Sequence, residues 1–307
     1  MKETKYHLEP NKHLFYTVFP KADIIIKDEK GIVLYKVPYT TKHDYYPVYV
    51  AEYALANYNK YLETKNEESK EEFISHINWL VDNIVKKEKF GVWEHYYKLP
   101  YYDFKIPWIH GMAQGLAVSA LLRGYELTKE KKYLETAKLA YNVFNVFLDK
   151  GGVRYVDENG DLWLEEYSVT PPPHILNGYI FALLGAYDYY LFTKDKKAKD
   201  IWDKGIKTLE NNLKNYDLGY WSLYNLTHNH PAPVHYHKIH ITQLNKLYKM
   251  TKKKIFKEYS EKWERYLNSW TNKKKASLKR GLIHLKKHGI KKGLQRYISR
   301  KRWQKVS

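Results

Sequence analysis

Tyr125-Glu126-Leu127-Thr128-Lys129 follows an apolar segment with helical spacing, and its pattern Tyr-x-x-Thr-Lys returns at Tyr61, Tyr190 and Tyr248. Successive threonines of the pattern lie 64, 65 and 58 residues apart. After each copy comes a charged turn and then a second amphipathic segment, such as Tyr133 to Phe147. Each repeat is therefore predicted to be a helical hairpin.

Helix pairs that recur at this period bury one another's faces, either in an open solenoid or in a closed toroid. Long connections rich in Gly, Pro and aromatic residues separate the hairpins, at residues 86–106, 149–172 and 216–236. They favour the toroid, in which such connections form the ligand-facing loops. Small residues in Gly111–Ala117 would let neighbouring helices approach closely. We expect a mainly α fold, an (α/α) toroid over residues 41–270.

The two ends of the chain differ from this central part. Ala22–Ile26 and Ile32–Val37 are β-branched runs around a glycine turn, which predicts a small β-hairpin element within a β-rich N-terminal segment, residues 1–40. Residues 271–307 form a basic tail with fourteen Lys and Arg and no Asp or Glu, out of a net charge of +19. Its apolar residues fall near one helical face, as in a basic amphipathic helix: Leu278, Leu282, Leu285, Leu294, Tyr297 and Ile298.

Composition bounds the class of protein. The 307 residues are 44% hydrophobic, enough for one large globular domain or two small ones. There is no cysteine, so disulfides and thiolate chemistry are excluded. The sequence lacks a run of about 18 apolar residues and an apolar signal-peptide core. We therefore expect a cytoplasmic protein, held peripherally at a membrane if its tail binds one.

The first candidate for chemistry is Glu165-Glu166-Tyr167, which precedes Pro171-Pro172-Pro173. Prolines fix φ and interrupt regular structure, so two carboxylates and a phenol are expected on a rigid loop that opens the next helix. The alternative interpretation is an exposed acidic turn.

Two further segments contain many acid, base or aromatic groups. Trp93–Tyr97 and Pro107–Gly115 would form an aromatic wall suited to sugar rings, or else a rigid loop packed on the end of the toroid. His235, His237 and His240 invite a metal, yet the segment lacks the glutamate of a His-Glu-x-x-His motif, so we expect none. These histidines would instead pack at a helix start or bind an anion.

The ordered motifs of residues 46–266 resemble the C-terminal catalytic domain of D-glucuronyl C5-epimerases, which convert glucuronate to iduronate in heparan-like chains. The resemblance rests on these motifs: Pro107-Trp108, Met112-Ala113-Gln114-Gly115, Gly152-Val153-Arg154, Trp163, Glu165-Glu166-Tyr167, Thr170-Pro171, Leu176-Asn177-Gly178, Leu223-Tyr224-Asn225-Leu226, Tyr236-His237, His240-Ile241 and Gln243-Leu244. The family fold is an (α/α) toroid.

The resemblance implies four catalytic residues, Glu166, Tyr167, Tyr224 and Tyr236. The substrate-binding residues that we expect in addition are Arg154, Trp108, Gln114, Glu165, Asn177, His237, Lys238 and His240. The chain departs from the family at Thr227, where an arginine is usual. Its loop between Tyr224 and Tyr236 is also shorter, and the large N-terminal β region of the animal enzymes is reduced to about forty residues.

C5 epimerisation removes a proton α to a carboxylate and returns one on the other face of the ring, so it needs two acid/base groups and donors that neutralise the carboxylate. Glu166 would be one base, and Tyr236 or Tyr167 the group on the opposite face. Arg154, His237 and Lys238 are candidates to hold the carboxylate in place of the arginine.

Other functions stay open at this point. A uronate lyase begins with the same proton abstraction, a glycoside hydrolase needs two convergent carboxylates, and a binding module needs neither. As partners we expect a glucuronate-containing polysaccharide, an anionic membrane surface through residues 271–307, and no nucleic acid. A homodimer is compatible with the sequence, the tail could equally be a solvated end, and no cofactor is expected.

Overall fold

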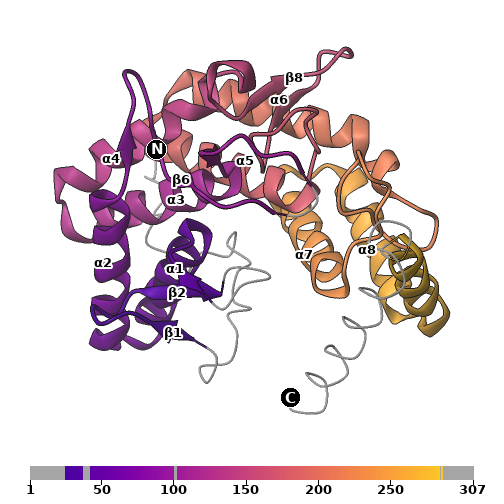
Figure 1. Ribbon diagram of the computed structural model, residues 1–307, viewed down its shortest axis with the longest axis horizontal. Coiled ribbons are helices and arrows are strands. Elements are labelled where there is room, and N and C mark those ends of the chain that lie inside the picture. The colour runs from indigo at the N-terminus through magenta and orange to yellow at the C-terminus, as the bar shows by residue number, and fades with distance from the viewer. Residues whose placement is uncertain (1–24, 37–41, 100–101, 284, 286–307) are drawn as a thin grey trace. The chain divides into compact units, whose positions relative to one another are not determined.

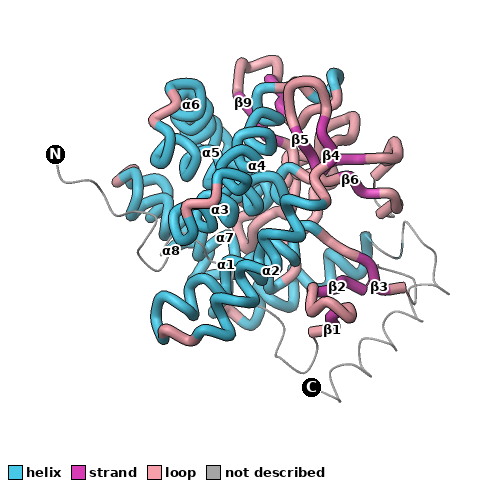
Figure 2. Tube along the Cα trace, turned by 90° about the vertical axis from the view of Figure 1, so that its left-hand side faces the viewer, coloured by secondary structure: helices cyan, strands magenta, loops and turns pink. Residues whose placement is uncertain are grey.

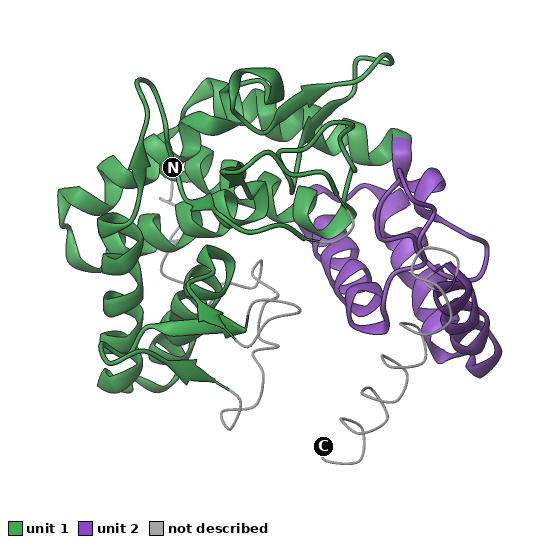
Figure 3. Cartoon of the chain, in the orientation of Figure 1, with its two compact units in different colours: residues 1–211 green, residues 212–307 purple. Residues whose placement is uncertain are grey.

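The structure is a computed structural model that describes residues 25–36, 42–99, 102–283 and 285. The chain divides into two compact units, residues 1–211 and residues 212–307 (Figure 3). This division lies inside the region 41–270 that the sequence predicts as one toroidal domain, and the predicted boundaries at residues 40 and 270 stay predictions.

The described residues are mainly helical (Figure 2). The first unit contains α1 (Pro47–Thr64), α2 (Glu67–Asp82), α3 (Gly111–Thr128), α4 (Lys131–Asn142) and α5 (Leu176–Thr193), and α6 (Lys196–Asn212) ends it. The second contains α7 (Val234–Thr251), α8 (Lys254–Asn268) and a further helix over residues 270–283. Consecutive helices pair as hairpins, α1 with α2, α3 with α4 and α7 with α8 (Figure 1).

The Tyr-x-x-Thr-Lys repeat ends the first helix of each hairpin. In every copy the lysine adopts a left-handed conformation, as Lys129 does with φ 62°, and its N–H donates to the tyrosine carbonyl. The Thr128 hydroxyl donates to the Gly124 carbonyl and accepts from the Glu130 N–H, so one side chain satisfies groups on both sides of the helix end. The predicted repeat is therefore a C-terminal capping motif.

Helices α3 and α5 cross at two glycines. A Cβ on Gly115 would lie 2.5 Å from the Phe181 carbonyl oxygen, and one on Gly185 would lie 2.4 Å from the Gly115 Cα. This confirms the expectation that small residues bring neighbouring helices together. Nearby, the buried Arg123 guanidinium is 2.7 Å from the Asp188 carboxylate, and removing one partner of such a pair typically costs about 3–5 kcal/mol.

Short antiparallel strands occupy the N-terminal segment and the connections. β1 (Ile26–Lys27) pairs with β2 (Val33–Lys36), which also pairs with β3 (His43–Asp44), so the predicted β-hairpin forms beside α1. Between α2 and α3 lie β4 (Val85–Lys86), β5 (Gly91–Val92), β6 (Glu94–His95) and β7 (Trp108–Ile109). Between α4 and α5 lie β8 (Arg154–Val156) and β9 (Leu162–Leu164), preceded by the 3-10 helices η2 (Val143–Asn145) and η3 (Leu148–Lys150).

In the second unit, the 3-10 helix η4 (Leu213–Tyr216) leads into an irregular loop that ends at α7. The helix over residues 270–283 buries Ala276 and donates from Arg280 to the Ala232 carbonyl at 2.9 Å. Leu278, Leu282 and Leu285 are exposed, as the amphipathic pattern predicts, while Leu294, Tyr297 and Ile298 lie outside the described residues. Among the helices that the structure describes, none has the length and apolarity needed to cross a membrane.

Candidate active-site residues in each unit

Glu165 and Glu166 follow β9 directly, and their side chains have different surroundings. The Glu165 carboxylate accepts from the His174 backbone N–H at 3.0 Å and lies 2.6 Å from the His174 Nδ1. His174 in turn packs on the Trp163 ring, with centroids 4.2 Å apart. Glu165 therefore secures the proline-containing loop that leads into α5. Both carboxylates are buried, so the alternative of an exposed acidic turn is wrong.

Glu166 is held between the starts of two helices. Its carbonyl accepts from the Gly111 N–H at the start of α3, at 2.9 Å. Its carboxylate lies against Gly178 in the first turn of α5, where an added Cβ would be 1.9 Å from Oε2. Only glycine at position 178 leaves room for this carboxylate, which gives the Leu-Asn-Gly motif a physical role.

His110 is a titratable neighbour of Glu166. Its Nε2 is 3.7 Å from the Glu166 Oε1, and the side chain is 1% exposed. Burial, with a smaller contribution from His95, holds the pKa of His110 well below its usual range. The imidazole is therefore neutral near pH 7, and the contact is a polar one rather than an ion pair.

Tyr167 joins an aromatic cluster formed with the connection between α2 and α3. Its ring centroid lies 5.1 Å from that of His110 and 5.5 Å from that of Trp108. Trp108 is 1% exposed, stacks on His95 at 4.2 Å and donates from its indole N–H to the Tyr97 carbonyl. Trp108 thus packs the cluster from within, as in the alternative of a rigid packed loop, and offers no open face to a sugar.

The other predicted binding residues of the first unit have distinct settings. Gln114, in the first turn of α3, is fully buried, and within the described residues its amide nitrogen and oxygen have no hydrogen-bond partner. Asn177 is buried in the first turn of α5. The Arg154 guanidinium lies over the Phe147 ring, with its Cζ 5.4 Å from the centroid.

The second unit contains the two predicted catalytic tyrosines. Tyr224 lies in the loop before α7 and Tyr236 in the first turn of α7, and their ring centroids are 4.8 Å apart. Both are partly exposed, and the exposed His235 packs on Tyr236 at 4.0 Å. Sequence reasoning placed these residues near histidines, and the structure confirms that proximity.

His237 and His240 follow the first of the two alternatives for these histidines, packing at a helix start. The Ser222 N–H donates to the His237 Nδ1, and the His237 Nε2 lies 3.0 Å from the Trp263 carbonyl, which fixes the neutral tautomer with Nε2–H as donor. Burial lowers the pKa of His237 to about 4. His240 is also buried, with its Nδ1 2.9 Å from the Ser222 Oγ, and burial holds its pKa well below the usual range. Neither histidine fits the expected role of binding a substrate anion, since both are neutral core residues.

Lys238 and Thr227 are exposed, so Lys238 remains available as a cation at the start of α7. In the part of the chain that the structure describes, no three His, Asp or Glu side chains come together in a way that could hold a metal ion.

Sequence reasoning missed His110, Gly178 and Ser222. His110 and Gly178 stand inside quoted motifs, beside Gly111 and Asn177, so a closer look at every residue of those motifs could have found them. Ser222 gave no sequence signal, because its role depends on two histidines fifteen and eighteen residues away.

Comparison with known proteins supports the resemblance. A family model described as D-glucuronyl C5-epimerase C-terminus matches residues 86–265. An uncharacterized protein of Methanocaldococcus jannaschii is 33% identical over 181 residues, which are 58% of this chain and 58% of that protein. D-glucuronyl C5-epimerase of Caenorhabditis elegans is 29% identical over 177 residues, which are 52% of this chain and 29% of that protein. The match spans less than two thirds of either relative.

A solved structure, the GH76 α-mannanase of Bacteroides thetaiotaomicron, matches with a TM-score of 0.51 at 15% identity, over 78% of this chain and 62% of that one. This similarity concerns the fold alone and confirms the predicted (α/α) toroid class. Since the family model covers more than half of the chain, the chain belongs to the D-glucuronyl C5-epimerase C-terminus family.

Proposed function

We propose that this protein is a polysaccharide C5-epimerase that converts glucuronate residues to iduronate. The observation that carries the proposal is the environment of Glu166 within the Glu-Glu-Tyr motif of the family. Its carboxylate lies between Gly178 and a neutral His110, while the adjacent Glu165 is bonded to His174. One carboxylate of the pair therefore supports the loop, and the other is placed for chemistry.

The reaction starts when a base takes the C5 proton and the electron pair moves into the adjacent carboxylate. A second acid on the opposite face of the ring then returns a proton to C5 and inverts its configuration. We assign the first role to Glu166. The neutral His110 beside it adds no positive charge, so it does not weaken the basicity of the carboxylate as an ion pair would.

Tyr167, in the same unit as Glu166, is our candidate for the opposite face, and the family resemblance implies Tyr236 and Tyr224 as further acid/base candidates. The two phenols of the second unit lie side by side and are partly exposed, unlike the tyrosines buried in the core. Lys238 follows Tyr236 by two residues, and its ammonium is a candidate to stabilise a phenolate or the substrate carboxylate.

The developing charge on the substrate carboxylate needs donors where the family usually has an arginine and this chain has Thr227. With His237 bonded internally, Arg154 and Lys238 are the remaining cations that we propose for this role, together with the amides of Gln114 and Asn177. Amide donors cost little reorganisation when they are fixed in advance in a buried setting.

The geometry favours this reaction over glycoside hydrolysis. A hydrolase needs two carboxyl groups that flank one glycosidic bond, whereas the Glu165 and Glu166 side chains have separate partners. A lyase shares the first step and differs only in expelling the C4 substituent, so products must separate the two.

The test is incubation with a desulfated glucuronate-containing polysaccharide in heavy water, followed by NMR of the sugar residues. We expect deuterium at C5 and new iduronate, with the chain length unchanged. Unsaturated chain ends would make the protein a lyase, and the absence of both deuterium and cleavage across several glucuronate polymers would contradict the proposal.

We further propose that the basic tail attaches the enzyme to an anionic membrane surface. Exposed Leu278 and Leu282 lie four residues apart on the helix over residues 270–283, beside the cations of Lys275 and Lys279. Replacing both leucines by serine should lower co-sedimentation with phosphatidylserine vesicles several-fold. Unchanged sedimentation would remove the idea.

A further inference from the structure

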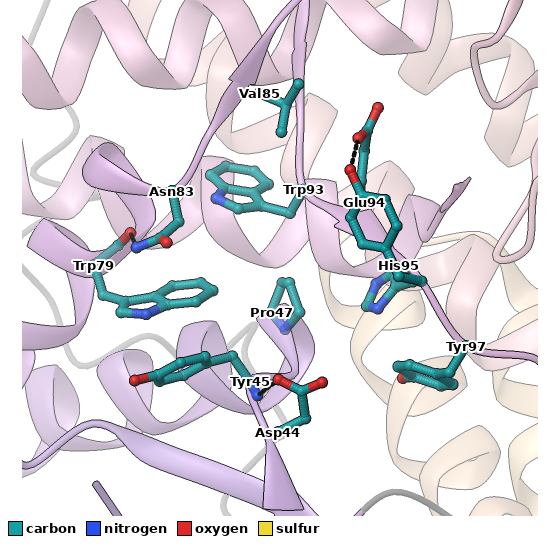
Figure 4. Close-up of a pocket in the computed structure, with 11 residues that line it drawn as sticks. Asp44, Tyr45, Pro47, Trp79, Asn83, Val85, Trp93, Glu94, His95 and Tyr97 are labelled. Carbon is teal, nitrogen blue, oxygen red and sulfur yellow. Dashed lines mark hydrogen bonds between the residues drawn. The ribbon is translucent and has the colours of Figure 1, made fainter. Parts of the chain in front are cut away.

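A pocket of the first unit contains aromatic rings that the proposed reaction does not use. The cavity measures about 230 Å³ and lies between β3, the start of α1, the end of α2 and the strands β4 and β6. Figure 4 shows Trp79 and Tyr45 on one side, His95 and Tyr97 on the other, and Pro47 between them. The other lining residues are Asp44, Asn83, Val85, Trp93, Glu94 and Tyr96.

The aromatic rings are fixed and partly open. Tyr45 and Trp79 pack with centroids 5.2 Å apart, and both are partly exposed. The Tyr45 hydroxyl donates to the Asp28 carboxylate at 2.5 Å, which holds this ring at the mouth of the pocket. Behind them, the buried Trp93 donates to the Leu80 carbonyl. Rings held in this way present apolar faces of the kind that pack against the C–H faces of a pyranose.

Polar groups line the same cavity. Asn83 donates from Nδ2 to the Trp79 carbonyl at 2.9 Å, and its amide lies between the Trp79 and Trp93 rings (Figure 4). His95 is 2% exposed, and its Nε2 has no hydrogen-bond partner among the described residues. An amide and an imidazole can donate to or accept from sugar hydroxyls.

The charges along the pocket are negative. Asp44 and Glu94 line it, and the part of its lining that the structure describes includes no Lys or Arg. Glu94 accepts from Lys87 and Tyr96, both at 2.6 Å, and these bonds outweigh its burial and lower its pKa, so it stays ionised at neutral pH. Lys87 offsets the charge of Glu94, so Asp44 is the carboxylate that would repel a uronate here, whereas a sugar with a hydroxymethyl group would not be repelled.

We propose that this pocket is a saccharide-binding site for a pyranose without a carboxylate, separate from the uronate at Glu166. The inference rests on the proposed function only for the class of ligand, a carbohydrate. His95 lies between the pocket and the residues around Glu166, because it lines the pocket while its ring centroid is 5.9 Å from that of His110. A residue of the same polymer is therefore the ligand that the pocket would take.

The test compares methyl β-glucopyranoside with methyl β-glucuronopyranoside, which differ only at C6. Saturation-transfer NMR is run on the full chain and on Trp79→Ala, and the difference between the two proteins isolates binding at the pocket from binding near Glu166. We expect the glucoside signal to fall at least fivefold in Trp79→Ala and the glucuronide signal to change little. Trp270→Ala, which removes an exposed tryptophan elsewhere, should leave both signals unchanged.

A second variant, which changes only an exposed charge, covers the case in which Trp79→Ala does not fold. Asp44 is exposed, so Asp44→Lys should fold normally and raise the glucuronide signal several-fold. A glucoside signal that does not depend on Trp79, or a glucuronide signal that falls as far as the glucoside signal in Trp79→Ala, would overturn the proposal. Since no turnover is measured, failure of C5 exchange would leave this result standing, and the reverse also holds.

Discussion

Both units bury histidines, and His237 in the second unit is satisfied differently from His110 in the first. In the second unit, His237 has partners for both ring nitrogens, the Ser222 N–H and the Trp263 carbonyl. In the first unit, the His110 Nε2 lies 3.7 Å from the Glu166 carboxylate, and its Nδ1 has no partner among the described residues. Buried polar groups normally find partners, so His110 marks a place suited to a ligand and His237 a place built for stability.

The largest expected effect comes from changing Tyr236, the neighbour of His237 on α7. Tyr236→Phe removes only a phenol from a partly exposed ring, so stability should stay within about 1 kcal/mol while kcat falls by about 10²–10⁴, the usual range for an acid/base group. The measurement is the rate of C5 deuterium incorporation. Tyr220→Phe, in the loop before α7, is the matched control, and equal rates in the two variants would remove Tyr236 from the mechanism.

Gly178→Ala tests the placement of Glu166 without changing any titratable group. The new Cβ would meet the Glu166 carboxylate and Cβ at 1.9 and 2.6 Å, so the carboxylate must move. We expect kcat to fall on the order of 100-fold, since a shift of about 1 Å at a reacting group has that effect. Gly281→Ala, where nothing lies within 4 Å, should leave kcat unchanged. Full activity of Gly178→Ala would show that the position of Glu166 does not matter.

The pH dependence of the free energy of unfolding tests the stabilising role of His237. His237 has a folded pKa of about 4, below the unfolded value near 6.5, so the unfolded state takes up its proton first as the pH falls. The stabilisation is complete above about pH 6.5 and is lost towards pH 4, a loss of roughly 3 kcal/mol. Urea unfolding at several pH values checks this. The free energy of unfolding should change less steeply with pH in His237→Gln than in the wild type. An equal slope would place the effect elsewhere, for instance at His76.

Much of the fold could be predicted because its signals are local. Tyr-x-x-Thr-Lys marks helix ends through hydrogen bonds within six residues, so each copy is readable in the sequence. Adjacent side chains diverge, so different surroundings for Glu165 and Glu166 could be suspected from the sequence. Their partners, His174 and Gly178, are set by the path of the loop.

The individual binding residues were harder to predict, since burial decides their roles. Trp108 and His237 have the residue types of a sugar or anion site, yet each is enclosed by contacts from distant segments, Tyr97 and Trp263 among them. The pocket around Trp79 could be predicted only in part. Trp93–Tyr97 was expected as an aromatic wall, but α1 and α2 join it only in the folded chain.

The central claim is that Glu166, and not its neighbour Glu165, takes the C5 proton. The most direct measurement is loss of deuterium from a C5-deuterated glucuronate polymer into water, with wild type, Glu166→Gln and Glu165→Gln side by side. The account predicts that Glu166→Gln releases deuterium at least 1,000-fold more slowly, whereas Glu165→Gln stays within about tenfold of wild type once its lower stability is allowed for. Release by Glu166→Gln at the wild-type rate would contradict it.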